Sequence, residues 1–103
     1  MIIKINSKLE ARITSGSYDY GEYYKGSAHF YEPWQPGDSI PDNNPVYKRF
    51  LYRLTTDIKR TNPRDAQYDA FELVKDVCFQ NGIAWQQFKQ LSSNYYEVIT
   101  LDN

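Results

Sequence analysis

The first segment of the chain alternates between apolar and polar side chains. Over residues 2–14, isoleucine, leucine and alanine take almost every odd position, and charged or polar side chains take most of the even ones. This period of two is typical of a half-buried strand. A hairpin turn at Asn6-Ser7 would place Ile5 opposite Lys8 and mix the two faces. The pattern therefore predicts one long strand over residues 2–14.

The next segment is rich in serine, glycine and tyrosine. Ser15-Gly16-Ser17 has the composition of a turn. The tyrosines that follow favour strands, and Lys25-Gly26-Ser27 suits the tip of a hairpin. We therefore expect two further strands over residues 18–32, which complete an antiparallel meander of three strands with residues 2–14.

The second half of the chain changes to helical spacing. Apolar side chains recur every three or four residues over 46–60 and again over 63–80. Each stretch follows an asparagine and a proline that suit the start of a helix, and Asn81-Gly82 suits its end. A third, short helix is predicted over 84–92. Residues 95–101 favour a strand that returns to the N-terminal sheet, with a continued helix as the alternative.

Together these elements predict a single α+β domain over residues 1–103. Its antiparallel sheet would have three or four strands, the fourth being the C-terminal segment, and two or three helices would pack on it. The proline-rich stretch 33–45 would be a stiff loop between the sheet and the helices. A chain of 103 residues has the size of one domain with one modest core.

Net charge and cysteine content narrow the setting. The formal net charge is -1, which gives no overall attraction to nucleic acid or to acidic membranes. Cys78 is the one cysteine, so an intramolecular disulfide is excluded and a reducing compartment is favoured. The sequence shows neither a signal peptide nor an apolar run of membrane-spanning length. We expect a cytoplasmic protein without membrane contact.

Side chains suited to catalysis are scarce. His29 is the one histidine, and the cysteine at 78 lies on the apolar face of a predicted helix, where a thiol is usually inert. Neither metal-ligand spacing nor a phosphate-binding loop is present. We therefore expect a protein that is not an enzyme, without catalytic residues, metal or cofactor. A small enzyme that uses a Cys78–His29 dyad is the second alternative.

The predicted helix 46–60 carries a line of positive charge. Arg49, Arg53 and Arg60 fall on one line of its outer face, with Lys48 and Lys59 beside them. Solvated helices usually mix both signs, because pairs of opposite charge four residues apart add stability. This surface would suit phosphate or an acidic protein. We include all five cations among the binding residues.

The predicted helix 63–80 carries the opposite charge. Asp65, Asp69, Glu72 and Asp76 follow the same helical spacing on its outer face. Basic and acidic lines of matched spacing could pair between two copies, and a twofold dimer is the usual symmetric arrangement. The sequence therefore predicts a homodimer as one oligomeric state that the protein could adopt.

Residues 15–37 combine tyrosine, serine and glycine with Trp34 in proportions similar to those of antibody binding loops. In a strand, alternate side chains take opposite faces. We expect Tyr18, Tyr20 and Tyr24 to pack on the helices. Tyr23, Tyr31 and Trp34 would then be exposed for binding; the alternative is that these side chains only cover a sheet edge.

A weak helix-turn-helix pattern spans residues 74–91, although its second helix has a single cation, Lys89. We expect a small non-enzymatic binding protein that occupies a surface of a larger protein or nucleoprotein. It would suit a viral or plasmid accessory or inhibitor protein, for example an anti-defence protein that acts against its host. The alternative is a nucleic-acid-binding regulator that uses helix 46–60.

Overall fold

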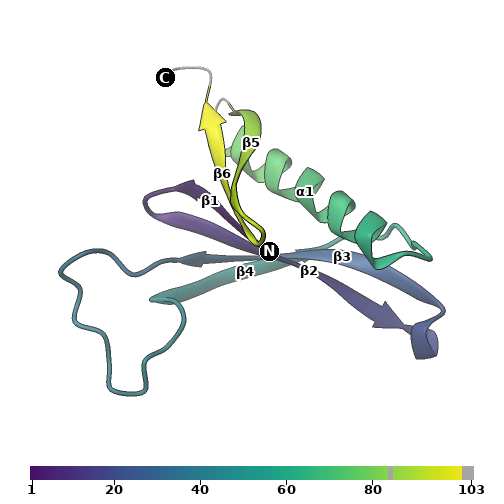
Figure 1. Ribbon diagram of the computed structural model, residues 1–103, viewed down its shortest axis with the longest axis horizontal. Helices are drawn as coiled ribbons and strands as arrows, with labels where there is room; N and C mark the ends of the chain where they lie inside the picture. Colours follow the sequence, from purple (N-terminus) through teal and green to yellow (C-terminus); the bar gives the residue numbers. More distant parts are fainter. Residues whose placement is uncertain (84, 101–103) are drawn as a thin grey trace.

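The computed structural model describes residues 1–83 and 85–100, which form a mixed sheet of six strands and one α-helix (Figure 1). The strand order is β4-β3-β2-β1-β6-β5; β1 and β6 are parallel, and every other pair of neighbours is antiparallel. The elements are β1 (Ile2–Asn6), β2 (Leu9–Tyr18), η1 (Asp19–Gly21), β3 (Tyr23–Glu32), β4 (Arg49–Thr55), α1 (Pro63–Gln80), β5 (Trp85–Ser92) and β6 (Tyr95–Thr100). The α+β class holds, but an antiparallel sheet of three or four strands with two or three helices is wrong.

A hairpin replaces the single strand predicted over 2–14. Asn6 pairs with Leu9, and the side-chain Oδ1 of Asn6 accepts a hydrogen bond of 2.8 Å from the backbone N–H of Lys8. The register shifts between Lys4 and Asn6, which leaves Ile5 as an extra residue in β1. Such a bulge changes the phase of a strand by one residue. Ile5 therefore stays buried, at 4 % exposure, and the turn does not mix the two faces.

The second hairpin turns later than the glycines indicate. Residues 15–17 and 25–27, expected as turns, lie inside β2 and β3, and the chain reverses at Asp19–Gly21. Gly26 serves packing instead, because a Cβ atom there would lie 2.0 Å from the backbone oxygen of Ala66 in α1. The glycine thus lets the helix approach the sheet closely.

The helix expected over 46–60 is wrong, since β4 occupies Arg49–Thr55. Phe50 and Leu54 are four residues apart, as on a helix face, but Phe50, Tyr52 and Leu54 also fit a period of two. Pairing with β3 decides between these patterns. Tyr52 stacks on the buried Phe30 with ring centroids 4.9 Å apart. Aromatic side chains of this kind favour strands.

The short helix expected over 84–92 is also wrong, with residue 84 outside the described residues. Trp85–Ser92 forms β5, which pairs with β6, so a helix-turn-helix unit over 74–91 is excluded. The strand expected over 95–101 is confirmed for Tyr95–Thr100, and residue 101 lies outside the described residues. It joins the N-terminal sheet in parallel with β1.

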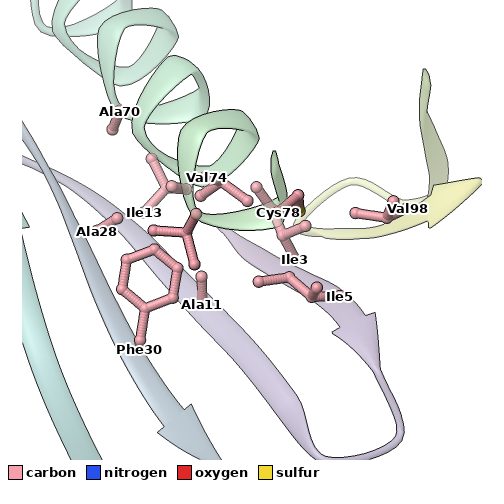
Figure 2. Close-up of a cluster of buried hydrophobic side chains, with 11 residues drawn as sticks. Ile3, Ile5, Ala11, Ile13, Ala28, Phe30, Ala70, Val74, Cys78 and Val98 are labelled. Atoms are coloured by element: carbon pink, nitrogen blue, oxygen red, sulfur yellow. The ribbon is translucent and has the colours of Figure 1, made fainter. Parts of the chain in front are cut away.

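The helix predicted over 63–80 is confirmed. The backbone N–H of Arg64 donates to the Asn62 side chain at 2.8 Å, and Gly82 follows the helix with a positive φ of 70°. The apolar stripe of α1 packs on the isoleucines and alanines of β1–β3 (Figure 2). The helix therefore covers one face of the sheet.

Gly26 offers a test of this close approach. We expect Gly26→Ala to lower the free energy of unfolding by about 2–3 kcal/mol, because the new methyl group meets helix backbone that cannot rotate away. Urea denaturation measures the change.

Gly16→Ala is the matched control, because its Cβ would make an ordinary contact of 3.4 Å with the Tyr18 ring. Its stability should change by less than about 0.5 kcal/mol. Equal losses in both variants would show that the sheet disfavours alanine generally and that the helix contact is not the cause.

Candidate functional site

Three basic side chains lie abreast on the face of the sheet opposite α1, which we call the open face. The pairing register places Arg12 of β2 opposite His29 of β3, and His29 opposite Arg53 of β4. The neighbouring residues Ala11, Ala28 and Phe30 face α1, so strand alternation turns the three basic residues away from it. We call Arg12, His29 and Arg53 the cationic row.

The cationic row places the guanidinium groups of Arg12 and Arg53 on either side of His29. Like charges directly opposite each other destabilise a sheet, so a proton on His29 is unfavourable in this position. Partial burial lowers the pKa of His29, and the guanidinium groups of Arg53 and Arg12 lower it further. The His29 ring also lies near Thr14, with Nε2 3.4 Å from Oγ1. His29 is therefore kept neutral more readily than an exposed histidine.

A second row on the same face shows how the chain balances charge elsewhere. Lys89 pairs with Glu97, Glu97 with Lys4, and Lys4 with Glu10. Opposite charges thus alternate across β5, β6, β1 and β2, an arrangement that stabilises cross-strand pairs. We call this the mixed row. On this face the sign of the charge therefore alternates across the mixed row but not across the cationic row.

An aromatic cleft borders the cationic row. The ring of Tyr31 stacks on Tyr47, with centroids 5.3 Å apart, and Tyr47 lies 6.2 Å from Phe50. The Tyr31 hydroxyl donates to Glu10 at 3.1 Å; burial raises its pKa, and the charge of Glu10 raises it further. The cleft has a volume of about 280 Å³ and is lined by Arg12, Thr14, His29, Tyr31, Tyr47 and Phe50.

A second aromatic cluster lies at the other end of β2 and β3. Tyr18 and Tyr23 are paired across the strands, and their rings stack with centroids 5.5 Å apart and planes 7° apart. The Lys25 ammonium lies 5.5 Å from the Tyr18 ring centroid, and that of Lys59 lies 4.6 Å from the Tyr23 centroid. Aromatic rings and cations therefore occur together at both ends of the open face.

The predicted aromatic binding residues differ in exposure. Tyr31 is only 5 % exposed, so its predicted exposure is wrong: it faces away from α1, but Tyr47 covers it. Tyr23 and Trp34 are half-buried, and the Trp34 Nε1–H donates to the backbone oxygen of Pro45 at 2.9 Å. The packing predicted for Tyr18, Tyr20 and Tyr24 is also wrong as a set, because Tyr20 is fully exposed at the turn. That these residues bind a partner stays a prediction.

The five predicted cations do not form one line, because the helix that would align them is absent. Lys48 and Arg49 contact Glu32 at 3.8 Å and 3.1 Å, and Arg60 forms a two-pronged pair with Asp69. Lys59 lies over an aromatic ring, and Arg53 belongs to the cationic row. The basic line is therefore wrong, so it does not match the acidic residues of α1, although the homodimer itself stays a prediction.

The sequence did not identify most of the residues that line the cleft as binding residues. They are Arg12, Thr14, His29, Tyr47 and Phe50. Alternation in residues 2–14 already places Arg12 and Thr14 on the polar face of a strand. Their juxtaposition with His29 and with β4 depends on the register between strands, which a single sequence does not show. The alternation of a strand could therefore indicate the face of a single residue, but the sequence could not indicate that these residues lie together.

The site also bears on catalysis. Within residues 1–83 and 85–100, no cluster of three or more histidine, cysteine or carboxylate side chains is arranged for a metal ion. Cys78 is buried between α1 and the sheet, whereas His29 lies on the open face, so the two do not form a dyad. Burial also raises the pKa of the Cys78 thiol, which disfavours the reactive thiolate.

Comparisons with protein-family models, curated proteins and solved structures find no match for this chain. In the described part of the chain, no helix combines the length and apolar character that a membrane crossing requires. The chemistry of the site must therefore be judged from its own residues.

The position of His29 in the cationic row predicts how the stability of the folded protein depends on pH. Because the pKa of His29 is lowered in the folded protein, the unfolded chain binds a proton first as pH falls. The contribution of His29 to stability is therefore complete above its unfolded pKa of about 6.5 and declines as pH falls through that value toward the folded pKa. His29→Gln should lose less stability than the wild type between about pH 7.5 and pH 5.

Proton NMR checks the cause, since His29 is the one histidine and its ring signals are unambiguous. The midpoint should lie below 6.5, and Arg53→Gln should raise it. Lys89→Gln, which removes a cation from the mixed row, should leave it unchanged. A wild-type midpoint at or above 6.5 would contradict the electrostatic description of the row.

Proposed function

We propose that the protein is a non-enzymatic binding protein that occupies a surface of a larger protein or nucleoprotein through the open face of its sheet. One observation carries the proposal: the cationic row of Arg12, His29 and Arg53 is unbalanced, whereas the mixed row beside it is balanced. Surface charge that opposes folding is often retained for function. A partner with acidic groups would compensate it.

The cleft beside the row supports the same proposal. Phe50 is 45 % exposed, and Tyr47 also keeps part of its ring accessible beside the buried Tyr31. Partly exposed aromatic rings next to arginine are the composition that dominates binding energy at protein interfaces. The cleft is small for a metabolite site, because such sites usually occupy about 300–1,000 Å³. It is better suited to one side chain or one ring of a larger partner.

The alternative, a nucleic-acid-binding regulator, is supported by a different arrangement from the one the sequence predicted. Residues 49–55 form a strand, so a basic helix does not carry it. The support comes instead from Arg12 on β2 and Arg53 on β4, which flank His29 of β3; Arg12 and His29 also line the aromatic cleft. Either partner would be acidic.

We place this function in the cytoplasm, because Cys78 is a free, buried thiol that suits a reducing compartment. An accessory or inhibitor role in a virus or plasmid, including an anti-defence role, stays a prediction. So does the absence of enzymatic activity, although the separation of His29 from Cys78 removes the one dyad that the chain offered.

The experiment compares affinity capture by three immobilised proteins from an extract of cells that contain the protein. They are the wild type, Arg12→Gln/Arg53→Gln, and the control Lys4→Gln/Lys89→Gln, which removes the same charge from the mixed row. Mass spectrometry should identify components that the wild type and the control capture and that the cationic-row variant loses by about tenfold or more.

Identical components on all three proteins, or none on any, would contradict binding through the open face. Treatment of the extract with nuclease separates the two classes of partner. A protein partner stays bound after this treatment, whereas components recruited through nucleic acid are released.

A further inference from the structure

We propose that the open face binds a single-stranded nucleic acid across β2, β3 and β4, with phosphates at the cationic row and bases on the flanking aromatic rings. This inference rests on the proposed function and names the chemical class of partner. It starts from the order in which side chains follow one another along the central strand of the three.

The open face of β3 carries a symmetric series of side chains. From one end to the other these are Tyr31, His29, Ser27, Lys25 and Tyr23. Aromatic residues thus stand at both ends, basic residues lie inside them, and a small hydroxyl lies at the centre. Eight residues of strand separate the two tyrosines, which is about 26 Å. This length accommodates several nucleotides of an extended strand.

The adjacent strands repeat part of the series. Arg12 and Arg53 flank His29, and Tyr18 stacks beside Tyr23. At the centre, Thr14 and Thr55 flank Ser27, and the hydroxyls of Ser27 and Thr55 are 2.9 Å apart. Opposite Lys25, β2 has Gly16, and opposite Tyr31 it has Glu10. The basic residues therefore form one band of three strands at His29 and a single cation at Lys25, separated by small side chains. A flexible polyanion can span the two positions.

The acidic residues of this part of the chain lie outside these positions. Glu32 is held by Lys48 and Arg49, and its position in β3 turns it to the side of α1. Glu10 accepts the hydrogen bond of Tyr31 at the end of the series. Among the described residues, none that the register places opposite His29, Ser27 or Lys25 is acidic. The charge of Glu32 is therefore balanced by neighbouring cations and does not oppose a phosphate at the cationic row.

The aromatic rings favour a nucleic acid over an acidic peptide. A protein can also cover such rings, but an acidic peptide carries carboxylates in place of rings, whereas a polynucleotide carries a base beside every phosphate. Bases supply flat faces for the partly exposed rings of Tyr47 and Phe50, and stacking of this kind contributes to affinity without requiring a particular sequence. In the Tyr18–Tyr23 stack the ammonium groups of Lys25 and Lys59 lie over the rings, so this end of the face offers cations for phosphate. A single strand is favoured over a duplex, because its bases are free to stack on side chains.

The test measures binding of a fluorescent oligothymidylate of about 12 nucleotides by anisotropy at several salt concentrations. Each phosphate that a cation neutralises in a single strand contributes a slope of about -0.7 in log K against log salt. Contacts from Arg12, Arg53, Lys25 and Lys59 should therefore give a slope near about -2.8. Affinity should fall steeply as salt is raised.

Matched variants locate the site. Arg12→Gln/Arg53→Gln should reduce the slope by about 1.4 and weaken binding by about tenfold or more. Lys4→Gln/Lys89→Gln removes the same charge from the same face and should leave affinity within about twofold, because these lysines alternate with Glu97 and Glu10 and lie outside the cationic row. Equal losses in both double variants would show attraction to overall charge only and would overturn the assignment of the site.

A second pair of variants tests the rings. Phe50→Leu should weaken oligothymidylate binding by about fivefold or more, because leucine cannot stack with a base. Phe79→Leu is the control, since Phe79 is 83 % exposed on α1, away from the open face. In NMR, added oligothymidylate should raise the titration midpoint of His29, because a nearby phosphate stabilises the imidazolium.

Polyglutamate forms the parallel arm of the experiment. If it binds the wild type and oligothymidylate does not, the inference is overturned and the open face takes an acidic protein, so the proposed function still stands. If neither probe binds at low salt, the inference is likewise overturned. The proposed function then depends on the capture experiment, in which a partner lost by the cationic-row variant would still support it.

Discussion

The close packing of α1 on β2 and β3 is the contact on which the rest of the structure depends. Ala66 and Ala70 bring the helix backbone so near to Gly26 that a single methyl group would collide with it. The helix therefore covers one face of the sheet with its apolar side chains, which continue along α1 to Val74, Val77 and Cys78. Because the described part of the chain supplies one helix, the opposite face stays without a covering layer.

That asymmetry gives the open face its chemistry. On β1, β6 and β5 the side chains of this face balance one another in the mixed row, as expected for a solvated surface. On β2, β3 and β4 the cationic row remains unbalanced and adjoins aromatic rings. Exposure to solvent is enough to explain the alternating charges of the mixed row. For the second half, our proposal is that an acidic partner compensates the positive charge that Arg12 and Arg53 place on either side of His29.

The sequence predicts the parts of this fold that depend on local signals. Helix 63–80 is recognisable because Asn62-Pro63 and Asn81-Gly82 mark its ends and its apolar residues recur at helical spacing only. The stretch 46–60 follows the same kind of start signal, Asn44-Pro45, yet residues 49–55 form a strand. Phe50 and Leu54 satisfy both periods, so only the pairing with β3 decides between them.

Two further features depend on contacts between distant residues. The bulge at Ile5 depends on how β1 meets β2, and the parallel pairing of β1 with β6 joins segments at opposite ends of the chain. The candidate site is of the same kind, because Arg12, His29 and Arg53 come from three strands. The sequence shows each of these residues as a polar position, but only the pairing register between the strands brings the three side chains together.

The most direct test of the central claim is the unfolding free energy of Arg12→Gln/Arg53→Gln in urea. If the row is retained for binding at a cost to folding, the variant should be as stable as the wild type or more stable by about 0.2–1 kcal/mol, because two like charges on either side of His29 are removed. A loss of more than about 1 kcal/mol would contradict the account. It would show that the arginines hold the sheet together and that their charge needs no partner.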